Sequence, residues 1–218
     1  MTRARAFHSA VRLRSGKVLV VGGGGPGDLT TELYDPATGA FSPARPRGAA
    51  SGSGALATLA SGEVLFVDNE GDSQAEIYDP DADTWTPTAS PPVQSMTGRP
   101  ATLHPDASVL LGGTVGCSGL GGGSFRCVSE TERFDPIGGS FSAGPAFRTG
   151  RLGPSAALLP EGEVLFAGGS PNTTALGAER YDGSAAATLA DDGPTSSLHV
   201  DSTTTMLPGG DVVVLDDW

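Results

Sequence analysis

The two cysteines of the chain are the first residues whose type and spacing suggest chemistry. Cys117 and Cys127 enclose a segment that is mostly glycine and serine. Zinc is not expected, because two cysteines without a nearby histidine or second cysteine pair supply half of a tetrahedral site, and a Cys-x-x-Cys redox spacing is absent. We predict a disulfide that closes this segment, contributes about 2 to 3 kcal/mol and indicates an oxidising compartment. The alternative is two unpaired thiols in a cytosolic chain.

Other motifs suggest ligand sites but lack the required context. Residues 22–27 fit the dinucleotide pattern Gly-x-Gly-x-x-Gly, yet Pro26 and a very short segment stand where the phosphate-binding helix would begin. Asp68, Glu70 and Asp72 offer oxygen ligands at alternating positions, but a terminal bidentate glutamate is missing, so we interpret them as a solvated turn and not a Ca²⁺ site. No Gly-x-Ser-x-Gly elbow or His-Glu-x-x-His motif occurs.

Composition limits the class of protein. The 218 residues include 13 Lys and Arg against 25 Asp and Glu, a formal net charge of −12 that disfavours a nucleic acid partner. Glycine is abundant, with 33 residues, and proline contributes 17, which excludes long helices. No run of about 18 apolar residues is present, so we expect no transmembrane segment. The chain is predicted to be an acidic, turn-rich, all-β protein.

Two short signatures recur at roughly 44 to 56 residues, the period of four-stranded propeller blades. The first is an aliphatic run that follows a turn, at residues 18–21, 64–67, 109–111, 164–167 and 212–215. The second is Glu-x-(Tyr or Phe)-Asp, which begins at Glu32, Glu76, Glu132 and Glu179, and a large aromatic follows the first three copies at Phe41, Trp85 and Phe141.

Each unit predicts four short antiparallel strands. The first and second strands are joined by two-residue turns such as Ser15-Gly16, and the third and fourth by Asp-Pro turns such as Asp35-Pro36. The whole chain, 1–218, is therefore one propeller domain. Its repeats cover approximately 1–44, 45–92, 93–146 and 147–192, with a partial repeat at 193–218.

These signatures resemble the kelch motif, with Gly-Gly after an aliphatic strand, then a tyrosine, then a tryptophan or phenylalanine. Arg5-Ala-Phe-His8 is also similar to the opening of bacterial, galactose-oxidase-like kelch units. Departures are Asp68-Asn69 and Asp216-Asp217 in place of Gly-Gly, and Gly183 in place of proline. The resemblance implies a kelch-type β-propeller, a fold that commonly has six or seven blades. We therefore expect this chain to be a fragment of a larger ring.

The repeats allow structural residues to be separated from candidate functional residues. Residues present in every copy are expected to build the scaffold, and function is expected at positions that differ between copies. The repeated glutamates are predicted to be structural, with Arg5, Arg99 and Arg151 as partners within a blade. Tyr34, Tyr78 and Tyr181 are predicted to lie in the core by the same logic.

The connections between second and third strands, and between blades, are long and variable. They share one face, which we predict to be the binding surface. The connection at 114–129 is the most irregular and would display Phe125 and Arg126. The candidate binding residues on this face are Asp28, Asp72, Phe125, Arg126 and Asn172.

The predicted function is a non-catalytic binding or scaffold module of a secreted or surface-attached bacterial protein, in an extracellular, periplasmic or cell-surface location, that engages a protein or a glycan. No catalytic residues, metal or cofactor are assigned. The alternative is an enzyme with residues partly outside this chain, either a carbohydrate-active enzyme, which can work with two carboxylates, or a copper-radical oxidase of the galactose oxidase type. His8, His104 and His199 fall at different heights of their units and are not expected to converge on one ion.

Overall fold

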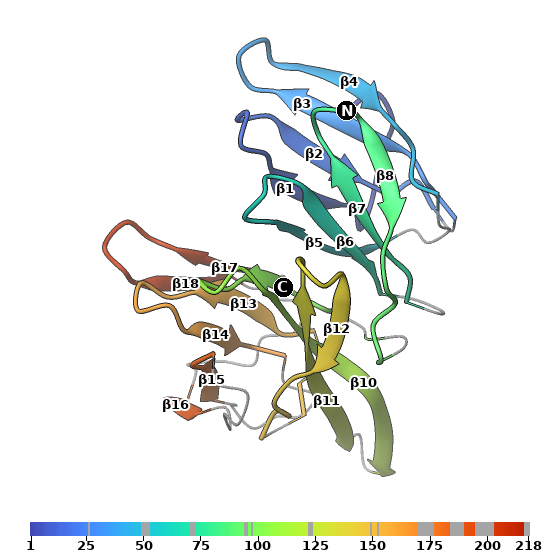
Figure 1. Ribbon diagram of the computed structural model, residues 1–218. Helices are drawn as coiled ribbons and strands as arrows, with labels where there is room; N and C mark the ends of the chain where they lie inside the picture. The colour runs from blue at the N-terminus through green and yellow to red at the C-terminus, as the bar shows by residue number, and fades with distance from the viewer. Residues whose placement is uncertain are drawn as a thin grey trace. The chain divides into compact units, whose positions relative to one another are not determined.

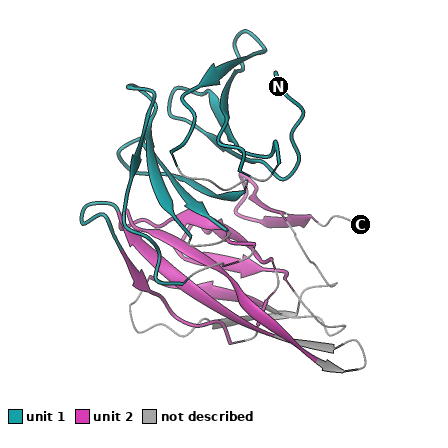
Figure 2. Ribbon diagram, turned by 90° about the vertical axis from the view of Figure 1, so that its right-hand side faces the viewer, with its two compact units in different colours: residues 1–95, 136–140 teal, residues 96–135, 141–218 magenta. Residues whose placement is uncertain are grey.

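The computed structural model describes residues 1–218 except 26, 49–52, 70–72, 94–95, 97, 122–123, 149, 152, 170–176, 184–189, 195–202 and 216–218. For residues 120–121, 124–126, 177 and 190–194 it describes the backbone alone. The described residues form eighteen strands and no helix, so none of them belongs to a membrane-crossing helix. Figure 2 shows the two compact units of the chain, Met1–Ser95 with Pro136–Ser140 and Met96–Asp135 with Phe141–Trp218.

Unit 1 contains two complete four-stranded antiparallel sheets, each with its strands in chain order (Figure 1). Blade 1 consists of β1 (Ser9–Arg12), β2 (Val18–Val21), β3 (Thr31–Asp35) and β4 (Ala40–Ala44). Blade 2 consists of β5 (Gly54–Thr58), β6 (Val64–Asp68), β7 (Ala75–Asp79) and β8 (Thr84–Pro87). The first strands of the two blades, β1 and β5, contact each other, as neighbouring inner strands do in a propeller.

Unit 2 repeats this pattern. Blade 3 consists of β9 (Ala101–Leu103), β10 (Val109–Gly121), β11 (Ser124–Asp135) and β12 (Ser140–Ala143), and blade 4 of β13 (Ser155–Leu158), β14 (Val164–Ala167), β15 (Gly177–Tyr181) and β16 (Ala190–Pro194). A two-stranded hairpin follows, β17 (Thr203–Met206) and β18 (Val212–Leu215). Inner strand β13 contacts both β9 and β17. Four complete blades and half of a fifth, as the repeats predicted, are confirmed.

The aliphatic second strands form the core because both of their faces are covered. In unit 1, Leu19 and Val21 of β2 pack with Val64 and Phe66 of β6, and all four are at most 1% exposed. In unit 2, Phe166 of β14 packs against Phe147 with ring centroids 5.0 Å apart. Continuous apolar strands of this kind are expected where neighbouring sheets cover them on both sides.

In each of blades 1 to 3, the repeated aromatic residues form one cross-strand pair. Tyr34 lies directly opposite Phe41, and Tyr78 directly opposite Trp85, with ring centroids 4.8 and 4.9 Å apart. Phe134 and Phe141 repeat the contact at 4.8 Å. Tyr78 and Tyr181 are fully buried, whereas Tyr34 is half-buried. The signature therefore encodes aromatic pairs that join the third and fourth strands.

The connection expected at 114–129 is not a loop. Strands β10 and β11 continue through it as an antiparallel ribbon, paired from Val109 opposite Phe134 to Gly121 opposite Ser124. Valine, threonine and serine residues lie among the glycines here, and two register irregularities absorb the extra residues without ending the ladder. The two cysteines lie directly opposite each other in this ribbon.

Candidate functional site

The repeated glutamates are held by arginines within their own blades. Each of the four carboxylates is almost completely buried and pairs with one guanidinium. The pairs are Arg5 with Glu32 (2.9 Å), Arg47 with Glu76 (3.5 Å), Arg99 with Glu132 (3.8 Å) and Arg151 with Glu179 (2.9 Å). The pairing predicted for Arg5, Arg99 and Arg151 is confirmed. Sequence reasoning missed Arg47, which lies in a proline-rich connection, although it precedes its glutamate at nearly the same spacing as Arg5 and Arg151 do.

Two of the arginines also bind the glycines that follow the second strands of their blades. Arg5 Nη1 donates to the carbonyl oxygen of Gly22 at 2.6 Å, and Arg151 Nη1 donates to that of Gly168 at 2.8 Å. One guanidinium thus ties the second strand of a blade to its third. In blades 1 and 4, the glycine, the arginine and the glutamate thus form one structural motif.

Three of the carboxylates also accept hydrogen bonds from nearby backbone N–H groups. Glu32 accepts hydrogen bonds from the backbone N–H and the hydroxyl of Thr2, Glu76 from the N–H of Gly48, and Glu179 from the N–H of Arg148. Burial by itself raises the pKa of Glu32, but the hydrogen bonds from Thr2 and Arg5 outweigh it, so the pKa lies below its usual value. The carboxylate is consequently a fixed anion of the scaffold.

The predicted disulfide is present, and it joins Cys117 of β10 to Cys127 of β11. Cys127 is buried, whereas Cys117 is exposed. In the same ribbon the backbones of Phe125 and Arg126 lie opposite Gly119 and Ser118. Their side chains lie outside the description of the structure, so their assignment to a binding surface stays a prediction.

Asp28 lies in the connection between β2 and β3. Its side chain is 8% exposed and its carboxylate accepts hydrogen bonds from the N–H groups of Gly24 (2.8 Å) and Thr30 (3.1 Å) and pairs with Arg5 (3.1 Å). Burial acts to raise its pKa, but the bonds from Thr30 and Gly24 and the charge of Arg5 lower it overall. The side chain organises its own loop. Asp72 and Asn172, the other candidates on this face, lie outside the described residues.

His104 occupies a position where the four other copies have leucine. The first-to-second-strand turns have the same backbone hydrogen bonds in all five copies, and the residue that starts each turn is Leu13, Leu59, His104, Leu159 and Leu207. The imidazole is 10% exposed, with Nδ1 3.1 Å from Asp106 Oδ1 and its ring against Tyr181. Arg133 binds the other oxygen of Asp106. His104 thus belongs to a compact polar cluster at this turn. His8 lies in unit 1, and His199 is outside the described residues.

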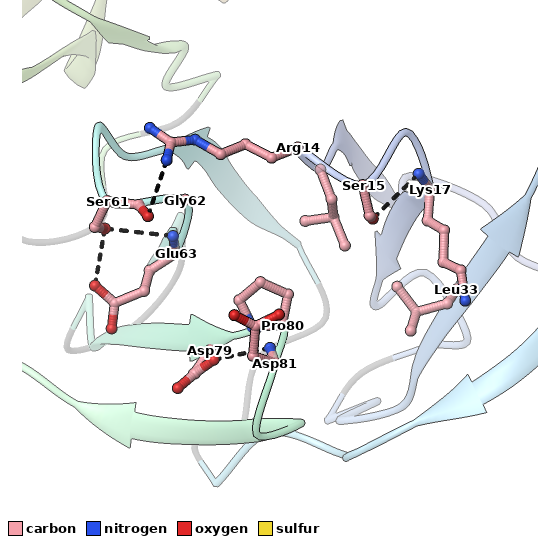
Figure 3. A pocket seen from close by; sticks show the side chains of 11 residues that line it. Arg14, Ser15, Lys17, Leu33, Ser61, Gly62, Glu63, Asp79, Pro80 and Asp81 are labelled. Carbon is pink, nitrogen blue, oxygen red and sulfur yellow. Dashed lines mark hydrogen bonds between the residues drawn. The ribbon is translucent and has the colours of Figure 1, made fainter.

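A groove in unit 1 is the feature that sequence reasoning did not find. It has a volume of about 480 Å³ and lies at the ends of the strands where the short turns gather (Figure 3). Blade 1 contributes Leu13, Arg14, Ser15, Lys17 and Leu33, and blade 2 contributes Ser61, Gly62, Glu63, Asp79, Pro80 and Asp81. This volume falls within the range of about 300 to 1,000 Å³ that is typical of small-molecule sites.

Hydrogen bonds between and within the turns hold the rim of the groove. The Arg14 guanidinium donates to the carbonyl oxygens of Ala60 and Ser61. Ser61 Oγ donates to Glu63 Oε2 at 2.9 Å, and Asp79 Oδ1 accepts the N–H groups of Asp81 and Ala82 at 2.8 and 3.1 Å. Arg14 is not repeated in the other units, where the equivalent residues are Ala60, Pro105, Pro160 and Pro208.

Comparison with protein-family models finds no match, and comparison with curated proteins finds none either. Among solved structures, the chain is similar to one described as a novel fungal alcohol oxidase with catalytic diversity among the AA5 family, in complex with copper. The identity is 13% and the TM-score 0.60, over 96% of this chain and 58% of the oxidase. It is also similar to YjhT, at 10% identity and a TM-score of 0.69, over 93% of this chain and 70% of YjhT. The chain thus spans somewhat more than half of the oxidase. At these identities the likeness shows the β-propeller fold that the blades already indicate.

Proposed function

We propose that this chain is a non-catalytic binding module built on kelch-type blades, and that the groove of blades 1 and 2 holds its ligand. The observation that supports this is the division of charged residues into two sets. The arginines and glutamates repeated in all four blades bind one another and the backbone. Arg14, Lys17 and Asp81, which are not repeated, line an open groove.

The variable connections, which the sequence predicts to form the binding surface, lie at one end of the strands. The groove lies at the opposite end. Those connections remain a second predicted surface of the same module, in a secreted or surface-attached bacterial protein, with a protein or a glycan as ligand. The disulfide supports an oxidising compartment. The alternative of an oxidase is supported only by a similarity of fold to one oxidase, at 13% identity.

Filling the groove tests the proposal. Ser15→Trp places a large side chain into it, and Glu161→Trp places the same side chain at the equivalent, exposed turn position of blade 4. On a broad peptide and glycan array, the wild-type chain and Glu161→Trp are expected to show the same saturable binding, whereas Ser15→Trp loses at least tenfold in affinity. Equal binding by all three proteins would overturn the groove as the site. Chemical conversion of a bound ligand, detected by mass spectrometry, would overturn the non-catalytic assignment.

A further inference from the structure

The charges of the groove are segregated by blade. Both cationic residues, Arg14 and Lys17, belong to blade 1, and all three carboxylates, of Glu63, Asp79 and Asp81, belong to blade 2. Figure 3 shows Lys17 on one side of the groove and Glu63 on the other, with Asp79, Pro80 and Asp81 between them and below. A ligand that spans the groove therefore meets the Lys17 ammonium on one side and the Glu63 carboxylate on the other, with Asp81 between them. The Arg14 guanidinium reaches across to Ser61 of blade 2 and adds no positive charge beside Lys17.

The cations differ in whether they are available to a ligand. Arg14 is committed to two carbonyl oxygens of the neighbouring turn. Lys17 is 45% exposed, and its ammonium lies 3.7 Å from Asp35 Oδ2. An exposed pair at that distance contributes about 0 to 1 kcal/mol, so the ammonium can turn to a ligand carboxylate at little cost.

The carboxylates divide in the same way. Asp79 Oδ1 is occupied by two backbone N–H groups that fix its turn. Asp81 is exposed, and among the described residues its carboxylate has no hydrogen-bond or ion-pair partner. Glu63 receives one hydroxyl hydrogen bond, which leaves acceptor positions open. One ammonium thus faces two carboxylates that can still accept.

The remaining lining selects among polar ligands. Leu13, Leu33 and Pro80 supply an apolar surface between the charged walls, and none of the eleven lining residues is aromatic. A sugar ring would find no aromatic face to stack on. Apolar side chains of a peptide would cover Leu33 and Pro80, and the removal of these apolar surfaces from water would favour binding.

We propose that the groove binds short zwitterionic peptides with apolar side chains, an inference that depends on the proposed function of the groove. The α-ammonium lies against Asp81 and Glu63, and the α-carboxylate lies against Lys17. The chemistry recognised is the pair of free termini, held apart by an apolar middle.

Isothermal titration with Leu-Ala-Leu and its blocked forms tests this. The free tripeptide is expected to bind, and acetylation of its amine or amidation of its carboxylate should each weaken binding at least tenfold. The Lys17→Gln variant should bind the free peptide more weakly than the wild type, and amidation of the peptide should not weaken its binding further. Acetylation of the peptide should likewise not weaken binding to the Asp81→Asn variant. Arg148→Gln and Asp211→Asn, which change exposed charges outside the groove, should bind like the wild type.

The failures are distinguishable. If the doubly blocked peptide binds as well as the free one, and Ser15→Trp abolishes both, the zwitterion inference is overturned while the groove stands. If no tripeptide binds at millimolar concentration, the inference is overturned as well, and the groove is then judged by the array comparison of Ser15→Trp with Glu161→Trp.

Discussion

Arg151 lies with both its Nε and one terminal nitrogen 2.9 Å from Oε1 of Glu179, and both side chains are at most 3% exposed. The same guanidinium donates to Gly168 at the end of β14. The contact recurs between Arg5, Glu32 and Gly22 in blade 1. A buried charge pair that also donates a hydrogen bond to a backbone carbonyl is costly to break. Removal of one partner leaves the charge of the other buried, unpaired and out of contact with water.

The first prediction concerns this pair. Arg151→Met is expected to lower the free energy of unfolding by about 3 to 5 kcal/mol, because Glu179 is left buried without its countercharge. Urea titration followed by tryptophan fluorescence measures the change. The double variant Arg151→Met with Glu179→Leu should recover part of the loss, since no unpaired charge remains buried.

The control pair contains Arg180, which follows Glu179 on β15. Arg180 and Glu163 are 2.7 Å apart but 38% and 28% exposed. Arg180→Gln is expected to change stability by about 0 to 1 kcal/mol. Similar losses for Arg151→Met and Arg180→Gln would contradict the structural role assigned to the buried pair.

The blades were predictable because the information for them is local. Each unit carries its own aliphatic strand and turn residues, the first three units also carry an aromatic pair, and the five copies reinforce one another. The ribbon of β10 and β11 was not predictable from the same cues. Its glycines have weak strand propensity, so the sequence favoured a loop, whereas the two strands stay paired as far as Gly121 opposite Ser124.

The groove escaped prediction for a different reason. It forms between turns of two blades, so its residues are far apart in the chain and belong to turns that look uniform in the sequence. The signal that was present is the exception within the repeat. Arg14 occupies a position where the other copies have alanine or proline. Lys17 occupies a position where the other copies have an acidic residue or serine.

The second prediction concerns acid stability. Burial acts to raise the pKa of Asp106, but hydrogen bonds from Ser108 and the contact with His104 lower it from 3.8 to about 2. Because the folded-state pKa is depressed, the unfolded chain takes up the proton first as the pH falls. The stability from this group is complete above about pH 5 and is lost between about pH 4 and pH 2.

Asp106→Asn removes that titration. The slope of unfolding free energy against pH between 4 and 2 is expected to be shallower in the variant than in the wild type. Asp211→Asn, an exposed carboxylate in the equivalent turn of the fifth repeat, serves as the control and should leave the slope unchanged. Parallel acid curves for Asp106→Asn and the wild type would show that the Ser108 and His104 contacts do not stabilise the anion.

The third prediction concerns the disulfide. Cys117 and Cys127 are separated by ten positions, so their bond closes a short loop of the unfolded chain. Replacing both with serine is expected to lower the free energy of unfolding by about 2 to 3 kcal/mol. Non-reducing peptide mapping checks that the bond forms, and urea titration measures the loss. The disulfide joins β10 to β11, so the effect of its removal should be largest in these two strands. Amide exchange should therefore accelerate in β10 and β11 more than in β13 and β14. Uniform acceleration in all four strands would contradict a local role.

The fourth prediction explains a departure from the repeat, the glycine at position 183 where three other units have proline. Gly183 has φ +85°, which proline cannot adopt, and a Cβ there would lie 2.5 Å from Cε1 of His104. Gly183→Ala is therefore expected to cost about 2 to 4 kcal/mol, the sum of backbone strain and the collision. Gly39→Ala isolates the strain, since Gly39 has φ +68° and open space around it, and should cost about 1 to 2 kcal/mol. If the collision is real, His104→Ala should reduce the cost of Gly183→Ala to that of Gly39→Ala in thermal unfolding. An unchanged cost in the His104→Ala background would mean that the histidine does not select glycine at this turn.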